Sequence, residues 1–201
     1  MIFGHWDRTR TAPASPVPPA TTNSQTASLE CYSLHPLANG SNLLMPTATR
    51  QATTADAEVV SSLNADVQAI HWSALPWRFK PPSPETFPPT AAAALLDQPN
   101  NLVFIAEVDS LPVGYAYAEV IHRPETSFHF AYDMVYLHHI SVRSTHRKRG
   151  LGRALMDAVR LAATEKGISL LALDVWTFNE EARLFFRRQG FTSYNERLWN
   201  R

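Results

Sequence analysis

The 201-residue sequence predicts an α/β protein in which helices lie on the faces of a mixed sheet. Strand-length apolar runs alternate with segments of helical periodicity from residue 45 onward, and two of the strands are separated by only a tight turn. The composition, with 45% hydrophobic residues and 18 basic against 18 acidic side chains, is that of a globular protein. These values exclude collagen-like, fully disordered and strongly charged chains.

The first 44 residues differ in composition from the rest of the chain. They hold only four charged side chains, show neither helical nor strand periodicity, and contain five prolines: Pro13, Pro16, Pro18, Pro19 and Pro36. Such a segment buries too little apolar surface to offset its ordering entropy. We therefore expect residues 1–44 to be a disordered extension, with a transit segment or translation from Met45 as alternatives, and residues 45–201 to form the functional domain.

The first part of the domain predicts a short extended segment followed by an amphipathic helix. Thr53 and Asp56 have the spacing of a capping box. Apolar residues then recur at steps of three and four: Val60, Leu63, Val67, Ile70 and Ala74. Five prolines within residues 81–89 predict a loop, and residues 90–98 predict a second, short helix.

A β-hairpin follows. Residues 101–108 and 112–121 predict two strands joined by a turn at Asp109 and Ser110. Alternation in the second strand places four side chains on one face: Val113, Tyr115, Tyr117 and Glu119.

The rest of the domain alternates strands and helices. A strand over residues 133–142 precedes a helix that starts near Leu151 and ends at Gly167. Residues 168–175 predict a buried strand, and Thr177 with Glu180 predicts a capped helix that ends at Gly190. Residues 191–199 predict a last short strand.

The cysteine count and hydropathy exclude several classes of protein. Cys31 is the only cysteine, so the chain has no internal disulfide, and no apolar run reaches the length of a membrane span. We expect a cytoplasmic protein that does not bind a membrane. No metal site is expected, because the histidines show neither an i, i+4 pair on a helix nor a HExxH pattern.

Positive charge is concentrated near the C-terminus, where residues 143–201 carry 12 Lys and Arg against 6 Asp and Glu. The segment Arg147-Lys148-Arg149-Gly150-Leu151-Gly152 joins a predicted strand to a predicted helix. Its glycines expose backbone N–H groups at a helix N-terminus, which favours binding of a pyrophosphate.

Two other phosphate-binding motifs are excluded. A Walker A loop would need Ser or Thr after a Gly-Lys pair, and none is present. A dinucleotide-binding fingerprint would need a small residue where this chain has Leu155. The segment lacks the interleaved aromatics of a nucleic-acid site.

The pattern Arg147-x-x-Gly150-x-Gly152 after a strand resembles the acetyl-CoA signature of the GNAT superfamily of N-acetyltransferases. The pattern Asn179-x-x-Ala182-x-x-Phe185-Phe186-x-x-x-Gly190-Phe191 resembles the family's C-terminal helix and following strand, and the resemblance spans residues 47–201. It implies a mostly antiparallel sheet of six to seven strands flanked by about four helices. It also implies acetyl-CoA as co-substrate and an amine as acceptor.

The resemblance further implies which residues bind acetyl-CoA. Backbone groups of the strand before the loop would pair with the pantetheine, the loop N–H groups would hold the pyrophosphate, and the Asn of the C-terminal motif would lie near the pantetheine. The cofactor-binding residues expected on this basis are Ile140, Ser141, Val142, Arg147, Lys148, Arg149, Gly150, Leu151, Gly152, Arg153 and Asn179.

Phe186 departs from the family pattern, since many members have a tyrosine there that protonates the leaving thiolate. Another group or water could donate that proton, or CoA could leave as the thiolate. Strand alternation places Tyr136 and His138 on one face and His139 on the other. His138, Tyr136 and Glu119 are the catalytic candidates, although a packed or surface imidazole is the simpler interpretation of either histidine.

The leading hypothesis is therefore transfer of an acetyl group from acetyl-CoA to a primary amine of a small molecule or protein by direct attack. The alternative, prompted by Phe186, is a CoA-binding sensor or interaction module without turnover. The identity of the acceptor is not encoded in these motifs, and a homodimer is left open.

Overall fold

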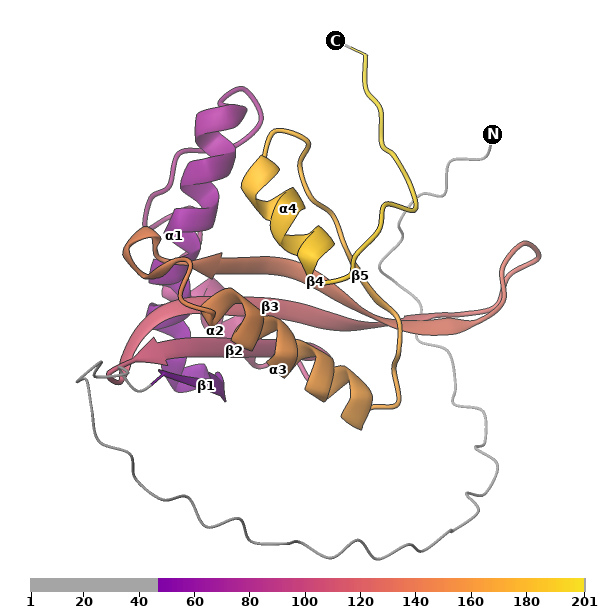
Figure 1. Ribbon diagram of the computed structural model, residues 1–201, viewed down its shortest axis with the longest axis horizontal. Helices are drawn as coiled ribbons and strands as arrows, with labels where there is room; N and C mark the ends of the chain where they lie inside the picture. Colours follow the sequence, from indigo (N-terminus) through magenta and orange to yellow (C-terminus); the bar gives the residue numbers. More distant parts are fainter. Residues whose placement is uncertain (1–46, 201) are drawn as a thin grey trace, which may run out of the picture. The chain divides into compact units, whose positions relative to one another are not determined.

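The computed structural model describes residues 47–200 (Figure 1). The predicted extension at residues 1–44, together with Met45 and Cys31, lies outside the described residues. Short 3-10 turns occur at Thr54–Asp56 and Ser144–His146. The strands and helices are, in chain order, β1 (Thr47–Gln51), α1 (Ala57–Ala74), α2 (Pro89–Leu96), β2 (Asn101–Val108), β3 (Leu111–Arg123), β4 (Tyr132–Val142), α3 (Leu151–Glu165), β5 (Leu171–Leu173) and α4 (Glu180–Arg188).

The sheet is mixed and mostly antiparallel, as predicted, with the strand order β1-β2-β3-β4-β5 and one parallel pair, β4 with β5. The expectation of six to seven strands was too high, because residues 47–200 form five. The predicted strand over residues 191–199 is absent there: Phe191 packs its ring against Phe186, and Trp199 packs against Trp176. The strand predicted over residues 168–175 shortens to β5.

Two apolar layers sandwich the sheet. Helices α1 and α2 cover one face, where Val60, Ile105 and Tyr115 are fully buried. Helices α3 and α4 cover the other face, where Leu155 and Val159 lie at the centre of a larger cluster. Figure 1 shows α3 and α4 in front of the strands and α1 behind them. Burial of apolar side chains on both faces explains why β2 is a nearly continuous apolar run.

The helix boundaries follow local capping chemistry. Thr53 N–H donates to the Asp56 carboxylate at 2.8 Å, which confirms the first capping box. The second predicted capping box is wrong: α4 is capped by Asn179, whose side-chain oxygen accepts from Ala182 N–H at 3.1 Å. Gly167 has φ 72°, as expected of the residue that ends α3.

A β-bulge in β3 changes which side chains share a face. Ala106 pairs with Gly114 and Glu107 pairs with Pro112, so Val113 has no partner on β2. Val113 therefore packs in the α3 layer while Tyr115 packs in the α1 layer. The prediction that these two residues share a face was wrong, because simple alternation does not count the extra residue of a bulge.

Within residues 47–200 we find no helix that combines the length and the apolar character required to cross a membrane.

Candidate functional site

The candidate site is a cleft that opens where β4 and β5 separate. The two strands are paired only between Val135–Leu137 and Leu171–Leu173. Beyond Leu137, β4 continues to Val142 while the chain after β5 turns away, so the facing edge of β4 has no strand beside it. A cleft of about 850 Å³ fills this gap, with Ile140, Ser141 and Val142 on its β4 side.

The N-terminus of α3 faces this cleft without a side-chain cap. Gly150 precedes the helix with φ 85°, and Lys148 also has a positive φ of 61°. A β-carbon on Gly150 would meet no atom within 4 Å, so the backbone conformation, rather than packing, favours glycine there. Backbone amides at the start of α3 are therefore available to an anion, and Leu151, Gly152 and Arg153 line the cleft.

Gly152 is glycine for a different reason. A β-carbon there would lie 3.3 Å from the Phe185 ring of α4, tighter than an ordinary van der Waals contact. The missing side chain lets α3 and α4 approach each other at the cleft.

Arg147 connects three parts of the site. Its Nε donates to the Val142 carbonyl at 3.0 Å, and its Nη1 lies 3.2 Å from the Glu181 carboxylate of α4. The guanidinium thereby holds the end of β4, the loop and the start of α4 together.

Of the other predicted binding residues, all but Arg149 line the cleft. Lys148, Gly150 and Asn179 line the cleft, together with the strand and helix residues already named. Arg149 does not line it and is exposed. Because the Asn179 oxygen is used to cap α4, its amide nitrogen is the end left for a ligand.

A second bulge places both neighbouring histidines on one face of the sheet. Tyr117 pairs with His139 and Ala118 pairs with Leu137, so His138 has no partner on β3. Both imidazoles contact the Tyr117 ring, with centroid distances of 4.6 Å for His138 and 5.8 Å for His139. The prediction that His139 points to the opposite face was therefore wrong.

The three predicted catalytic side chains lie together. His138 Nε2 is 2.8 Å from the Glu119 carboxylate, and the His138 ring lies 4.9 Å from that of Tyr136. A carboxylate accepts, so the His138 proton is on Nε2 and Nδ1 holds the lone pair of the neutral ring. Burial, followed by a hydrogen bond to Asp174, raises the pKa of the Tyr136 hydroxyl, which stays protonated at neutral pH. Of the three, only His138 lines the cleft.

His139 is held by a buried network that the sequence did not reveal. Its Nδ1 lies 3.0 Å from the Tyr115 hydroxyl and 3.4 Å from Asn64 Nδ2. Asn64 also donates to Tyr115 at 2.8 Å. Burial, with smaller effects from His138 and His71, lowers the pKa of His139 to about 4.

The sequence that forms this cleft matches a known protein family. The family described as "Acetyltransferase (GNAT) family" matches residues 65–191, which include β4, the glycine loop, α3 and α4. The chain belongs to the GNAT acetyltransferase family. No curated protein matches the sequence significantly.

Solved structures share this GNAT fold. A tetramutant of the BH1408 protein from Bacillus halodurans has a TM-score of 0.72 at 22% identity, over 77% of this chain and 99% of that one. The aminoglycoside N-acetyltransferase AAC(6')-Iy, in complex with CoA, has a TM-score of 0.61 at 22% identity, over 78% and 95%. The aminoglycoside acetyltransferase meta-AAC0020, from an uncultured soil metagenomic sample and in complex with sisomicin, has a TM-score of 0.58 at 19% identity, over 77% and 94%.

Phe186, the departure from the usual GNAT tyrosine, is buried and also lines the cleft. Its ring packs against Phe185 at 5.2 Å and Phe191 at 5.7 Å. The position thus combines core packing with access to the cleft, but its ring has no group that can donate a proton.

Aromatic rings form part of the lining of the GNAT cleft. His71 of α1 and Trp176, which follows β5, both line it. The His71 ring stacks on Phe79 at 4.9 Å, and Phe79 meets Trp176 edge-on at 5.5 Å. No motif in the sequence indicated Trp176.

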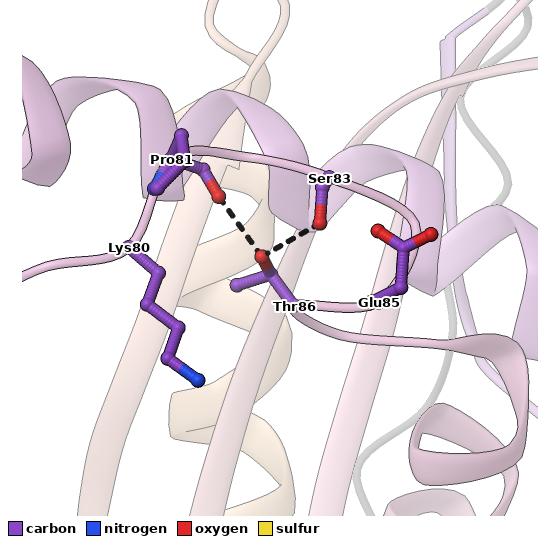
Figure 2. A pocket seen from close by; sticks show the side chains of 5 residues that line it. All are labelled: Lys80, Pro81, Ser83, Glu85 and Thr86. Atoms are coloured by element: carbon purple, nitrogen blue, oxygen red, sulfur yellow. Dashed lines mark hydrogen bonds between the residues drawn. The ribbon is translucent and has the colours of Figure 1, made fainter.

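A smaller hollow of about 170 Å³ lies in the proline-rich loop (Figure 2). Figure 2 shows the Thr86 hydroxyl between the Pro81 carbonyl, to which it donates at 2.9 Å, and the Ser83 hydroxyl at 3.1 Å. These bonds are internal to the loop, so we interpret them as holding its shape.

In the stretch that the structure describes, no three His, Cys, Asp or Glu side chains are grouped as a metal site would require.

Proposed function

We propose that this GNAT protein transfers an acetyl group from acetyl-CoA to a primary amine. The observation that carries the proposal is the separation of β4 from β5, which opens an 850 Å³ cleft onto the uncapped N-terminus of α3. One elongated ligand with an amide-bearing arm and a pyrophosphate fits both the strand edge and the helix terminus.

The edge of β4 would bind the pantetheine arm. Arg143 N–H donates to the Val113 carbonyl, so its backbone faces β3, and alternation turns Val142 and Ile140 toward the cleft. Because Arg147 already occupies the Val142 carbonyl, the Val142 N–H and the backbone of Ile140 are the groups that remain.

Amides at the start of α3, with Lys148 and Arg153 beside them, would hold the pyrophosphate. Arg147 would act mainly by fixing the loop, because Val142 and Glu181 engage its side chain.

In the reaction, the amine nitrogen attacks the thioester carbonyl carbon, the C–N bond forms, and the C–S bond breaks with its electron pair on sulfur. His138 Nδ1 would accept the proton of the attacking amine, while Glu119 orients the imidazole through Nε2. The thiolate would leave without a proton from residue 186, since Phe186 offers none.

The similar aminoglycoside acetyltransferases support an amine acceptor for this chain. Phe186 favours one second candidate, a CoA-binding sensor without turnover.

The deciding experiment incubates the full chain with acetyl-CoA and a panel of amines while a thiol reagent measures released CoA. Release that depends on the amine, with an acetylated product of the expected mass, supports the enzyme. Tight binding of CoA in calorimetry without amine-dependent release supports the sensor. Absence of both would overturn the proposal.

A further inference from the structure

We propose that His139 is a second catalytic residue, which offers a neutral imidazole Nε2–H to the acetyl carbonyl oxygen, and that Tyr115 and Asn64 are the positioning residues that fix this tautomer. The use of that N–H in acetyl transfer rests on the proposed function. The tautomer itself rests only on the geometry of this chain.

The direction of the hydrogen bonds determines where the proton lies. The amide nitrogen of Asn64 can only donate, and it lies 3.4 Å from His139 Nδ1 and 2.8 Å from the Tyr115 oxygen. The Tyr115 oxygen accepts from Asn64, so its own proton points to His139 Nδ1 at 3.0 Å. Nδ1 is therefore an acceptor, and the neutral ring carries its proton on Nε2.

The surroundings keep this imidazole uncharged. Tyr115 is 1% exposed and Asn64 is 7% exposed, and the two come from β3 and α1. The titratable side chains around His139 are Tyr115, Tyr117, His138 and His71. None of these is an anion at neutral pH that would stabilise an imidazolium, and burial lowers the pKa of His139 to about 4.

The neighbouring imidazoles thereby offer opposite chemistry. Glu119 accepts a hydrogen bond from Nε2 of His138, which leaves a lone pair on Nδ1 of that ring. Tyr115 donates a hydrogen bond to Nδ1 of His139, which leaves an N–H on Nε2 of that ring. Both rings line the cleft. One can therefore accept the proton of the amine while the other stabilises negative charge on the carbonyl oxygen.

The electron movements require no proton transfer from His139. As the amine attacks, the carbonyl π electrons move onto oxygen, and the Nε2–H donates a hydrogen bond to that charge. When the C–S bond breaks, the electrons return to the carbonyl and the proton remains on Nε2. A neutral donor suits this step because it keeps its proton throughout.

The first test measures the tautomer in the full chain without ligand, by 15N-NMR of histidine-labelled protein. We expect one protonated nitrogen, Nε2, and no titration of His139 down to about pH 5, because its pKa lies near 4. Tyr115→Phe combined with Asn64→Ala should remove both donors from Nδ1 and produce a mixture of tautomers. Protonation of Nδ1 in the native protein, or titration near neutrality, would overturn the proposal even if acetyl transfer is confirmed.

The second test compares two amides. Gln in His139→Gln places an N–H near the position of Nε2, whereas Asn in His139→Asn keeps only a group near Nδ1 that can bond Tyr115. We expect kcat to fall less than about tenfold in His139→Gln and by about 10²-fold or more in His139→Asn, with similar KM for acetyl-CoA. Equal kcat in both variants, with both folded by circular dichroism, would overturn the role of the donor. If the native chain transfers no acetyl group, the proposed function fails, while the NMR result still decides the tautomer.

Discussion

His138 Nε2 lies 2.8 Å from the carboxylate of Glu119, on the neighbouring strand. The contact depends on the bulge at His138, which lets this imidazole stack on Tyr117 with an interplanar angle of 13°. The pair is partly exposed, with 30% of the His138 side chain and 38% of the Glu119 side chain accessible. Such exposure gives this hydrogen bond little weight in stability, so its value lies in orienting the ring.

We expect His138→Gln to lower kcat by about 10²-fold or more, because it removes the proton acceptor. Glu119→Gln keeps a hydrogen-bond acceptor and should lower kcat less than His138→Gln does. Steady-state kinetics across pH, with acetyl-CoA affinity from calorimetry as control, checks both. An unchanged kcat in His138→Gln would assign the base elsewhere.

Gly152→Glu should weaken acetyl-CoA binding by more than about tenfold, because the carboxylate would repel a phosphate at the N-terminus of α3. Leu161→Glu is the matched control, since Leu161 lies on the same helix and is 61% exposed. Its affinity should equal that of the native chain. Equal affinity of Gly152→Glu and Leu161→Glu in calorimetry would remove the helix terminus from the site.

Arg147→Lys should reduce acetyl-CoA affinity although the charge is kept. Lysine has one ammonium group and cannot span Val142 and Glu181 as the guanidinium does. Glu181→Gln, which leaves the bond to Val142 intact, should have the smaller effect. Native affinity in Arg147→Lys would show that only charge matters at this position.

The ion pair between Arg50 and Asp56 predicts a pH-dependent contribution to stability. A hydrogen bond from Arg50 lowers the pKa of Asp56 to about 2, below its ordinary 3.8. Because the folded-state pKa is lowered, the stabilisation is complete above about pH 4 and is lost as pH falls through about 2.

Asp56→Asn should therefore lower the free energy of unfolding by about 1 kcal/mol at neutral pH, and the difference from the native chain should shrink below about pH 4. Urea unfolding at several pH values measures it. Glu165→Gln, at the exposed end of α3, is the control and should leave the free energy of unfolding at neutral pH unchanged. A difference that is constant with pH would contradict the assignment.

Phe186→Tyr should preserve the fold and raise kcat, because it adds a hydroxyl to a ring that lines the cleft. Phe186→Ala should cost about 3–5 kcal/mol of stability, since the ring is buried against Phe185 and Phe191. Thermal unfolding and single-turnover kinetics separate the two effects. An unchanged kcat in Phe186→Tyr would mean that departure of the thiolate does not limit the rate.

Local patterns predicted most of the described elements. The steps of three and four from Val60 to Ala74 correspond to α1, and the turn at Asp109 and Ser110 joins β2 to β3. Helix α3 ends where Gly167 predicted. These features depend on residues close in sequence, so periodicity and capping chemistry are sufficient to identify them.

The strand over residues 191–199 failed for the opposite reason. A strand needs a partner to pair with, and Trp199 contacts Trp176 instead. The missing partner is not written in the local sequence. The capping box at Thr177 failed because α4 begins at Glu180, so Asn179 takes the N-cap position and accepts from Ala182 N–H.

The glycine loop and its position between a strand and a helix could be read from local sequence, because the φ of 85° at Gly150 favours glycine. The separation of β4 from β5 after Leu137, and the shared face of His138 and His139, depend on how distant parts of the chain pair. A bulge is a difference in residue count between two paired strands, and alternation along one strand cannot record it. The network from Asn64 through Tyr115 to His139 joins α1, β3 and β4, so it exists only after those elements pack.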